Sequence, residues 1–290
     1  MVDGSTRVVG IIGGPDQVRG SLSPRIHNAA FRALGMGWIY LPFPVTAEVE
    51  TALRGLAAAG VHGVNVTMPH KLEAARVCDR LVGTAATVRA ANTVEVRDGR
   101  LVGHNTDGEG LIRFLRRDAG LEVSGATVLI AGAGGAARAI VAALAGAGAA
   151  EIAVAGREAR RVEELRDLSA GARFDAVQLA ALSADRVGSA DLIVNATPVG
   201  SADEPPVVPA EWIRPGVTVV DLTYLPPSTR LLREAREHGA IAHNGLGMLL
   251  HQAAMSFEIW TGVQPPIDEM SAAALRELSA TLKRPTQGAD

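Results

Sequence analysis

The sequence predicts an α/β protein with two domains, an N-terminal open twisted α/β domain and a doubly wound α/β domain. Short β-branched segments alternate with alanine-rich helical segments along the whole chain, which is typical of βαβ units on a mostly parallel sheet. A glycine-rich turn follows one of these segments and opens a helix. The chain has 290 residues, of which 48% are hydrophobic and 20% are charged, enough for a buried core in each domain.

The first half contains expected strands and helices in turn. Ser23 is expected to cap the first long helix, and Thr46 is expected to cap the next one, which Gly60 ends. The pair Asp98-Gly99 favours a tight turn and predicts a β-hairpin. The expected elements are a strand over residues 8–13, a helix over 23–34, a strand over 38–45, a helix over 48–59, a strand over 63–68 and the hairpin strands over 93–96 and 100–105.

The second half has a more regular rhythm. A helix is expected over residues 108–120, and six short apolar segments then alternate with helical or loop segments, as in a doubly wound sheet. Two helices, over residues 246–261 and 268–283, follow without a further strand. The six segments predicted as strands cover residues 127–132, 151–156, 174–179, 191–197, 218–223 and 240–245.

The glycine-rich turn after the first of these six strands matches the pattern GxGxxG/A in a strand-turn-helix context. Glycine at the first position allows a tight turn, and glycine at the second lets the backbone approach a pyrophosphate. The positive end of the helix favours the phosphates. A purely structural turn is the alternative. We predict a Rossmann-type dinucleotide site at Gly132, Gly134, Gly135, Ala136 and Ala137.

The end of the second of these strands bears on the choice between NAD and NADP. An acid at this place binds the ribose 2′-hydroxyl, whereas arginine accepts a 2′-phosphate. Gly156 occupies the strand end, and Arg157, Arg160 and Arg161 follow it, which favours NADP. Glu158 lies between the arginines and leaves NAD possible, and the whole stretch could also be a solvated helix start.

Composition argues against several classes of function. Of the 28 basic residues only Lys71 and Lys283 are lysine, and neither follows glycine as a GxxxxGK[ST] phosphate loop requires. A net charge of −3 without a long basic run argues against nucleic acid as a partner. Without a signal peptide or an apolar run of about 18 residues, a cytoplasmic protein without a membrane partner is expected. Cys78 is expected to be a small core residue, and the histidines lack metal-ligand spacing, so no metal is predicted.

Polar residues of the first half gather after predicted strands and at predicted helix starts. In an open α/β sheet, ligands bind beyond the carboxyl ends of the strands. A dinucleotide site combined with a lysine and an acid near such a crevice suggests hydride transfer with proton transfer at a hydroxyl or ketone. The polar clusters are SLSP at residues 21–24, NVTMPHK at 65–71, ANT at 91–93 and GHNTDG at 103–108.

With these clusters the chain resembles the shikimate dehydrogenase family. The match runs in order through SLSPRIHNAAF, NVTMPHK, ANTV, GHNTDGEG, GAGGAARA, NATPVG, DLTYLPPST and GMLLHQA, over about residues 8–262. The resemblance implies reversible reduction of 3-dehydroshikimate to shikimate with NADPH, in the route to chorismate and the aromatic amino acids. The expected partner is this small-molecule substrate, and the expected state is a monomer or a homodimer.

The resemblance further implies a catalytic pair, Lys71 and Asp107. A lysine can give up its proton, whereas arginine is effectively never deprotonated, which accounts for a lysine in an arginine-rich chain. Asp107 would orient the ammonium group and bind the substrate hydroxyl. The sequence leaves open which of the two residues carries the transferred proton. The alternative is a simple ion pair at a helix start.

Further residues of the site follow from the same motifs. Ser21 and Ser23, with Tyr224, would bind the substrate carboxylate. Thr67, Asn92 and Gln252 would hold the ring hydroxyls, with Asn65 in support, and Thr197 and Gly245 would contact the cofactor. Because Gln252 lies near the C-terminus, the substrate domain is expected to consist of residues 1–108 completed by helices over 246–290, with the dinucleotide-binding domain over 109–245 inserted.

One departure from the family's pattern leaves the substrate and cofactor open. AGRE replaces the usual NRT at the cofactor arginine, so an NAD-linked quinate/shikimate dehydrogenase or an aminoshikimate dehydrogenase is an alternative. Ser23, where quinate enzymes carry threonine, favours shikimate. A Schiff-base enzyme with Lys71 as its nucleophile, or a non-catalytic nucleotide-responsive binding protein, would also use some of these residues.

Overall fold

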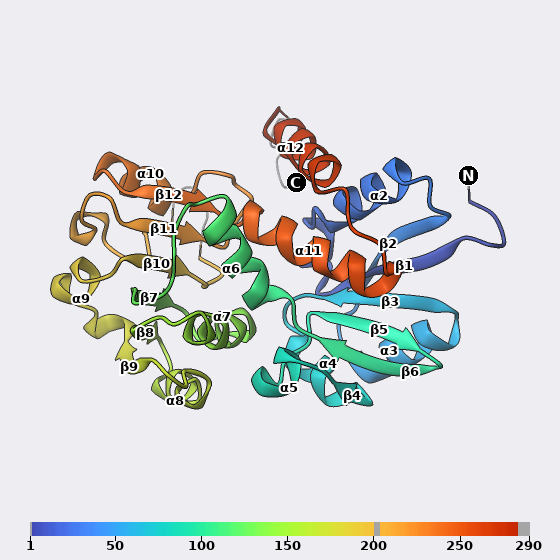
Figure 1. Cartoon of the computed structure of the whole chain (residues 1–290), viewed down its shortest axis with the longest axis horizontal. Helices are drawn as coiled ribbons and strands as arrows, with labels where there is room; N and C mark the ends of the chain where they lie inside the picture. The colour runs from blue at the N-terminus through green and yellow to red at the C-terminus, as the bar shows by residue number, and fades with distance from the viewer. Residues whose placement is uncertain (1, 200–203, 284–290) are drawn as a thin grey trace, which may run out of the picture. The chain divides into compact units, whose positions relative to one another are not determined.

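The computed structural model of the chain describes residues 2–199 and 204–283, with side chains described as far as residue 281. The chain forms two compact units (Figure 1). Unit 1 consists of residues 1–82, 91–104 and 253–290, and unit 2 of residues 83–90 and 105–252. The predicted α/β class and two-part architecture are confirmed.

Unit 1 contains a mixed sheet with the strand order β2-β1-β3-β5-β6-β4. The strands β2, β1 and β3 are parallel, whereas β5 is antiparallel to both β3 and β6. The predicted hairpin is therefore confirmed, and both of its turn residues have positive φ, 51° at Asp98 and 73° at Gly99. The strands are β1 (Arg7–Gly13), β2 (Trp38–Pro44), β3 (Val61–Val66), β4 (Arg80–Leu81), β5 (Thr93–Arg97) and β6 (Arg100–His104).

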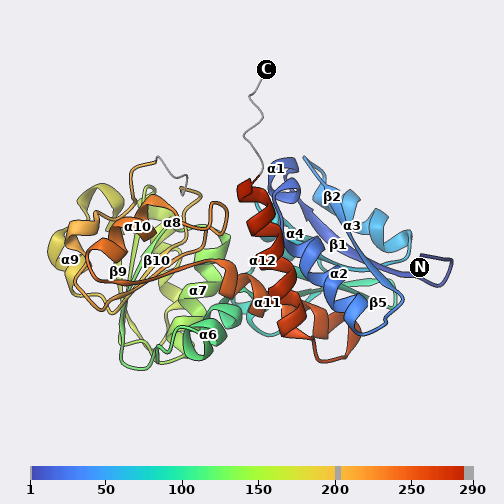
Figure 2. The ribbon, with the colours of Figure 1, turned by 90° about the horizontal axis from the view of Figure 1, so that it is seen from above.

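Helices cover both faces of this sheet. On one face, α3 and α4 bury apolar side chains such as Val49, Leu53 and Ala74 against the strands. On the other face, rings of α2 and of the later part of α11 pack against Tyr40 of β2. In Figure 2, α12 lies beside α2, and Arg25 of α2 pairs with Glu277 of α12 at 3.2 Å. The helices concerned are α1 (Pro15–Arg19), α2 (Ser23–Ala33), α3 (Val49–Ala58), α4 (Lys71–Val77), α11 (Leu246–Thr261) and α12 (Ile267–Lys283).

Two predicted helix caps are wrong. The backbone of Ser23 is already helical, so Leu22 is the N-cap of α2 and the side chain of Ser23 makes no capping hydrogen bond. Helix α3 begins only at Val49, with Glu48 as its N-cap in the left-handed region at φ 55°. Thr46 therefore lies too early in the chain to cap α3, because a cap must reach the N–H groups of the first turn.

Unit 2 contains six parallel strands in the order β12-β11-β10-β7-β8-β9. Counted from the first strand of the unit, this is the order 3-2-1-4-5-6 of a doubly wound dinucleotide-binding sheet, as predicted. The strands are β7 (Thr127–Ala131), β8 (Glu151–Gly156), β9 (Arg173–Gln178), β10 (Leu192–Asn195), β11 (Thr218–Asp221) and β12 (Ile241–Asn244).

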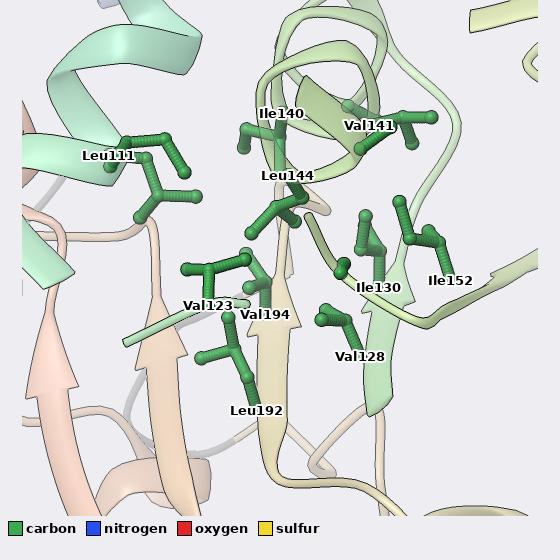
Figure 3. Packing of buried hydrophobic residues seen from close by; sticks show 14 of the residues in the cluster. Leu111, Val123, Val128, Ile130, Ile140, Val141, Leu144, Ile152, Leu192 and Val194 are labelled. Carbon is green, nitrogen blue, oxygen red and sulfur yellow. The ribbon is translucent and has the colours of Figure 1, made fainter. Parts of the chain in front are cut away.

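Each face of the second sheet buries alternate residues of its strands. Val128 and Ile130 of β7 face a core that Leu111 of α6 and Ile140 and Leu144 of α7 complete (Figure 3). Residues between them, such as Leu129, face the other core. This alternation follows from the two-residue repeat of a strand. The helices of the unit are α5 (Thr84–Val88), α6 (Asp107–Arg117), α7 (Gly135–Gly146), α8 (Ala159–Glu163), α9 (Ala184–Gly188), α10 (Arg230–Glu237) and the first part of α11, with short 3₁₀ turns at 166–168, 179–181 and 210–212.

The two units differ in extent from the predicted domains, 1–108 with 246–290 and 109–245. Asn105 belongs to unit 2, where its Nδ2 donates to Ala90 O at 2.9 Å, and this bond ties the segment 83–90 to the start of α6. Gln252 also belongs to unit 2, because the first part of α11 packs against α6. Packing contacts thus move both boundaries by a few residues. Among the described residues, no helix is long and apolar enough to cross a membrane.

Candidate active site

In unit 1, several predicted substrate residues gather where the strands of the sheet end. Thr67 is the first residue beyond β3, and its N–H donates to Ile12 O at 2.9 Å. Lys71 is the first residue of α4, and its C=O accepts from Ala91 N at 2.9 Å. Asn92 follows directly, and its C=O accepts from Val66 N at 2.8 Å. Backbone bonds therefore hold the NVTMPHK and ANT segments together.

The two serines of the SLSP cluster lie at the start of α2. Ser23 is the first helical residue and is buried, while Ser21 is half-buried in the turn before it. The Oγ of Ser21 accepts a hydrogen bond from Ser23 N at 3.2 Å. This bond fixes Ser21 relative to the helix start, where N–H groups and the positive helix end favour an anion.

Asn65 does not face open space but lies within a buried network of unit 1. Its Oδ1 accepts from Tyr40 Oη at 2.8 Å. Its Nδ2 lies 3.0 Å from Ser256 Oγ and 3.1 Å from Thr93 Oγ1. Asn65 therefore connects Tyr40 with Thr93 and Ser256, and its role toward a substrate stays a prediction.

Cys78 lies at the end of α4 and packs against the core of unit 1. Burial raises the pKa of its thiol to about 12. A thiol that stays protonated is a poor nucleophile, so Cys78 fits the predicted core residue.

In the described part of the chain, no cluster of three His, Cys, Asp or Glu side chains could hold a metal ion.

In unit 2, Asp107 and Gln252 lie on two helices that pack closely. Asp107 is buried at the first position of α6, where the positive helix end favours a carboxylate, and its N–H donates to Asn105 Oδ1 at 3.1 Å. Gln252 of α11 accepts at Oε1 from Thr106 Oγ1 at 3.4 Å. A Cβ at Gly110 would lie only 2.8 Å from Gln252 Cβ, so glycine permits this approach of the helices.

The predicted phosphate turn also lies in unit 2. Gly132 has φ 112°, and a Cβ there would lie 2.9 Å from Ala196 and 3.2 Å from Thr197 Cγ2, so only glycine fits. Thr197, at the end of β10, is held by Asn195 Oδ1, which accepts from both its N–H at 3.1 Å and its hydroxyl at 2.7 Å. The turn at the end of β7 thus lies beside Thr197.

The start of α7 offers the open backbone that a pyrophosphate needs. Gly134 is the N-cap of this 12-residue helix and is exposed, and nothing lies within 4 Å of the place of a Cβ. Gly135 and Ala136 form the first turn and are half-buried, while Ala137 is buried against the sheet. These residues fit a bound dinucleotide, since the helix N–H groups are accessible at its positive end.

The arginines after β8 differ in their ion pairs. Arg161 pairs with Glu158 at 3.0 Å, and Arg160 pairs with Glu164 at 3.1 Å. Arg157 is exposed and forms no ion pair within the part of the chain that the structure describes. A Cβ at Gly156 would lie 2.5 Å from Val162 Cγ2, which disfavours an acid at this strand end. Among these three arginines, Arg157 is thus the one without a carboxylate partner within the described residues.

The remaining predicted residues lie near the ends of β11 and β12. Gly245 precedes α11, and a Cβ there would lie only 2.0 Å from Leu222 O, so a larger residue cannot fit. Its N–H donates to Thr223 O at 3.1 Å, which joins this turn to the segment that contains Tyr224. Tyr224 is half-buried and belongs to unit 2, whereas the two serines belong to unit 1.

Comparisons with family models and with known proteins show which family the chain belongs to. Three family models match the chain: the shikimate dehydrogenase substrate binding domain over residues 11–94, shikimate / quinate 5-dehydrogenase over 115–222, and the shikimate 5′-dehydrogenase C-terminal domain over 245–275. A shikimate dehydrogenase (NADP(+)) of Methanopyrus kandleri is 45% identical over 285 residues, which cover 96% of this chain and 98% of the relative. The chain belongs to the shikimate dehydrogenase family.

Solved structures show the same family at the level of the fold. The shikimate 5-dehydrogenase of Thermus thermophilus, solved in complex with NADP(H) and shikimate, has a TM-score of 0.83 at 35% identity, covering 93% of this chain and 99% of that one. A quinate dehydrogenase of Corynebacterium glutamicum, solved in complex with NAD, has a TM-score of 0.84 at 28% identity, covering 93% and 99%. The family thus includes more than one activity.

Sequence reasoning missed several polar residues that hold the shikimate dehydrogenase motifs in place. Tyr40 and Ser256 are buried partners of Asn65, although neither lies in a motif cluster. No role was predicted for Thr93 within the ANT cluster, or for Asn105 and Thr106 beside Asp107. The position of Thr93 directly after Asn92, at the start of an expected strand, is the one available signal for Thr93, and nothing in the pattern indicates Ser256.

The close approach of α6 and α11 predicts a large effect of one methyl group. We expect Gly110→Ala to destabilise the protein by about 1–3 kcal/mol, because the added Cβ overlaps Gln252 and the helices must separate. Urea unfolding of the variant and of the parent checks this value. Gly55→Ala is the control, because nothing lies within 4 Å of a Cβ at Gly55 of α3. Equal destabilisation by both substitutions would contradict the packing argument.

Proposed function

We propose that the chain is an NADP-dependent shikimate dehydrogenase that reversibly reduces 3-dehydroshikimate to shikimate, on the route to chorismate and the aromatic amino acids. The observation that carries the proposal is the joint presence of the family's polar clusters and of a Rossmann turn followed by an arginine without an acidic partner among the described residues. This arginine is Arg157, and its charge is available to a phosphate.

The cofactor would be held by backbone more than by side chains. Gly134 leaves room for the pyrophosphate at the start of α7. We propose that the turn residue Gly132 and the first helical residues Gly135, Ala136 and Ala137 complete the phosphate site, and that Arg157 binds the 2′-phosphate. Thr197, Gly245 and, more weakly, Arg161 would complete this contact surface. When bound, NADP supplies a nicotinamide that exchanges a hydride with the substrate carbon.

We propose that a residue of the protein accepts the proton that the substrate hydroxyl loses. When the substrate hydroxyl is oxidised, its carbon loses a hydride and its oxygen loses a proton, so a group must take that proton. Lys71 as a neutral amine accepts it, and as an ammonium group it returns the proton to the ketone oxygen in the reverse direction. Asp107 binds the same hydroxyl and orients Lys71. Both residues stand at helix starts.

The substrate is recognised by neutral polar groups. Ser21, Ser23 and Tyr224 would bind the carboxylate through hydroxyl donors, and Thr67, Asn92 and Gln252 would bind the ring hydroxyls. The support for this assignment is local: Ser21 is oriented toward the start of α2, and Thr67 and Asn92 are held beside Lys71 by backbone bonds. Asn65 keeps a supporting place behind Asn92.

The test is a direct assay of the purified protein. Shikimate, quinate and aminoshikimate are each supplied with NADP⁺ or NAD⁺, and the reduced nicotinamide is followed by absorbance. We expect the highest kcat/KM for shikimate with NADP⁺. Faster turnover of quinate with NAD⁺ would support the second candidate, an enzyme like the relative from Corynebacterium glutamicum.

Two further outcomes would reject the proposal. Binding of NADP⁺ without turnover of any of the three substrates would indicate a non-catalytic binding protein. A stable adduct after borohydride treatment with substrate would indicate a Schiff base on Lys71, and we expect none.

Light scattering of the same preparation checks the proposed monomeric or homodimeric state, and cell fractionation checks the proposed cytoplasmic location.

A further inference from the structure

A buried group of hydroxyl and amide side chains lies behind Asn92 in unit 1. We call it the Thr93 network, and it comprises Tyr40 of β2, Asn65 of β3, Thr93 of β5 and Ser256 of α11. The four residues come from four separate elements, and each is at most 5% exposed. Buried hydroxyls and amides need partners, so their arrangement is strongly constrained.

The network has a definite hydrogen-bonding order at one end. Tyr40 Oη donates to Asn65 Oδ1 at 2.8 Å, so the amide nitrogen of Asn65 faces away from Tyr40. That Nδ2 lies 3.2 Å from Asn92 O, 3.1 Å from Thr93 Oγ1 and 3.0 Å from Ser256 Oγ. Asn65 is thus the donor toward the other members.

The order at the other end sets the orientation of Asn92. Thr93 Oγ1 lies 3.2 Å from Asn92 Oδ1, which has no proton, so Thr93 must be the donor. The hydroxyls of Thr93 and Ser256 are also within hydrogen-bonding distance of each other, at 2.8 Å. The carbonyl oxygen of the Asn92 side chain is therefore turned toward Thr93, and its Nδ2 donors face the other way.

Tyr40 is itself held rigidly. Its ring stacks on His27 with centroids 4.5 Å apart and an interplanar angle of 2°. Burial lowers the pKa of His27 to about 3, so this ring is neutral at ordinary pH. The side chain of Asn28 forms hydrogen bonds with both backbone groups of Tyr40. Its Oδ1 accepts from Tyr40 N and its Nδ2 donates to Tyr40 O, both at 2.9 Å. The far end of the network has little freedom to turn.

We propose that Thr93 is a positioning residue that fixes the amide of Asn92, with Ser256, Asn65 and Tyr40 fixing Thr93 in turn. The Nδ2 donors of Asn92 are thereby aimed at a ring hydroxyl of the substrate before it binds. The inference rests on the proposed function, in which Asn92 holds such a hydroxyl. Pre-orientation raises affinity, because binding then does not have to order the amide.

The experiment compares two substitutions at one position. Thr93→Val removes the hydroxyl at nearly constant shape, and Thr93→Ser retains it. We expect Thr93→Val to raise the KM for shikimate about fivefold, the effect of losing one modest hydrogen bond, with kcat and the KM for NADP⁺ within about twofold of the parent. Thr93→Ser should restore the parent KM for shikimate. Ser256→Ala, which removes the hydroxyl that contacts Thr93 Oγ1 at 2.8 Å, should raise the same KM by a smaller factor.

The possible results separate this inference from the function on which it rests. A parent protein without shikimate turnover would reject both. An active parent whose Thr93→Val variant keeps its KM for shikimate, or raises both KM values equally, would reject the positioning role alone. If Thr93→Val does not fold, Ser256→Ala is compared with the parent instead. An unchanged KM for shikimate in the folded Ser256→Ala variant would then reject the positioning role.

Discussion

Lys71→Arg is expected to lower kcat for shikimate oxidation by about 10²–10⁴-fold, the usual contribution of a positioned acid or base. Arginine keeps the positive charge and a similar length, but it does not give up its proton at any working pH. The loss should therefore nearly equal that of Lys71→Ala. Steady-state kinetics with saturating shikimate and NADP⁺ measure it, and the KM for NADP⁺ should stay near the parent value.

The matched control is Lys283→Arg. Lys71 and Lys283 are the two lysines of the chain, and Lys283 is the last residue of α12. Its replacement should leave kcat unchanged. Near-normal kcat in Lys71→Arg would mean that Lys71 only carries charge, and the proton would then have to move through another group.

Arg157→Ala is expected to lower kcat/KM for NADP⁺ by about 10- to 100-fold, which corresponds to a lost hydrogen bond between charged groups. Activity with NAD⁺, which has no 2′-phosphate, should change little. Arg157 is exposed and forms no ion pair within the described residues, so its charge is available to the ligand. Initial rates with each cofactor, at fixed ionic strength, measure the ratio.

Arg160→Ala is the control for this result. Arg160 is also exposed and lies three residues further along the chain, but it pairs with Glu164 at 3.1 Å. Arg160→Ala removes the same charge, and we expect it to lower kcat/KM for NADP⁺ much less than Arg157→Ala does. Equal losses in the two variants would show that net charge near α8 matters more than a direct contact of Arg157.

An ion pair also reduces the effect that the negative charge of Glu158 has on a phosphate nearby. Glu158 pairs with Arg161 at 3.0 Å, so its negative charge is partly compensated. The sequence places Glu158 directly after Arg157 and leaves its effect open. The ion pairs now distinguish the three arginines, because two of them have a carboxylate partner three or four residues away and one has none among the described residues.

The strands of the second sheet and the glycine-rich turn after the first of them could be predicted from the sequence. Strands β7, β8 and β10 are short runs of mainly apolar residues, so their signal is local. The φ of 112° at Gly132 is a conformation that glycine adopts readily, so the glycine indicates the turn. The helix starts were less well predicted. Whether Ser23 lies before or inside α2 depends on the backbone of one residue, which composition does not specify.

The residues that support the site could be identified only in the folded chain. Tyr40 and Ser256 lie far apart in the sequence, and both reach Asn65 because β2, β3 and α11 pack together in unit 1. The same holds for Gly110, whose missing side chain admits Gln252 from a helix that begins more than a hundred residues later. A sequence pattern records which residues can donate, accept or pack. Their partners depend on how distant segments meet, which only the folded chain specifies.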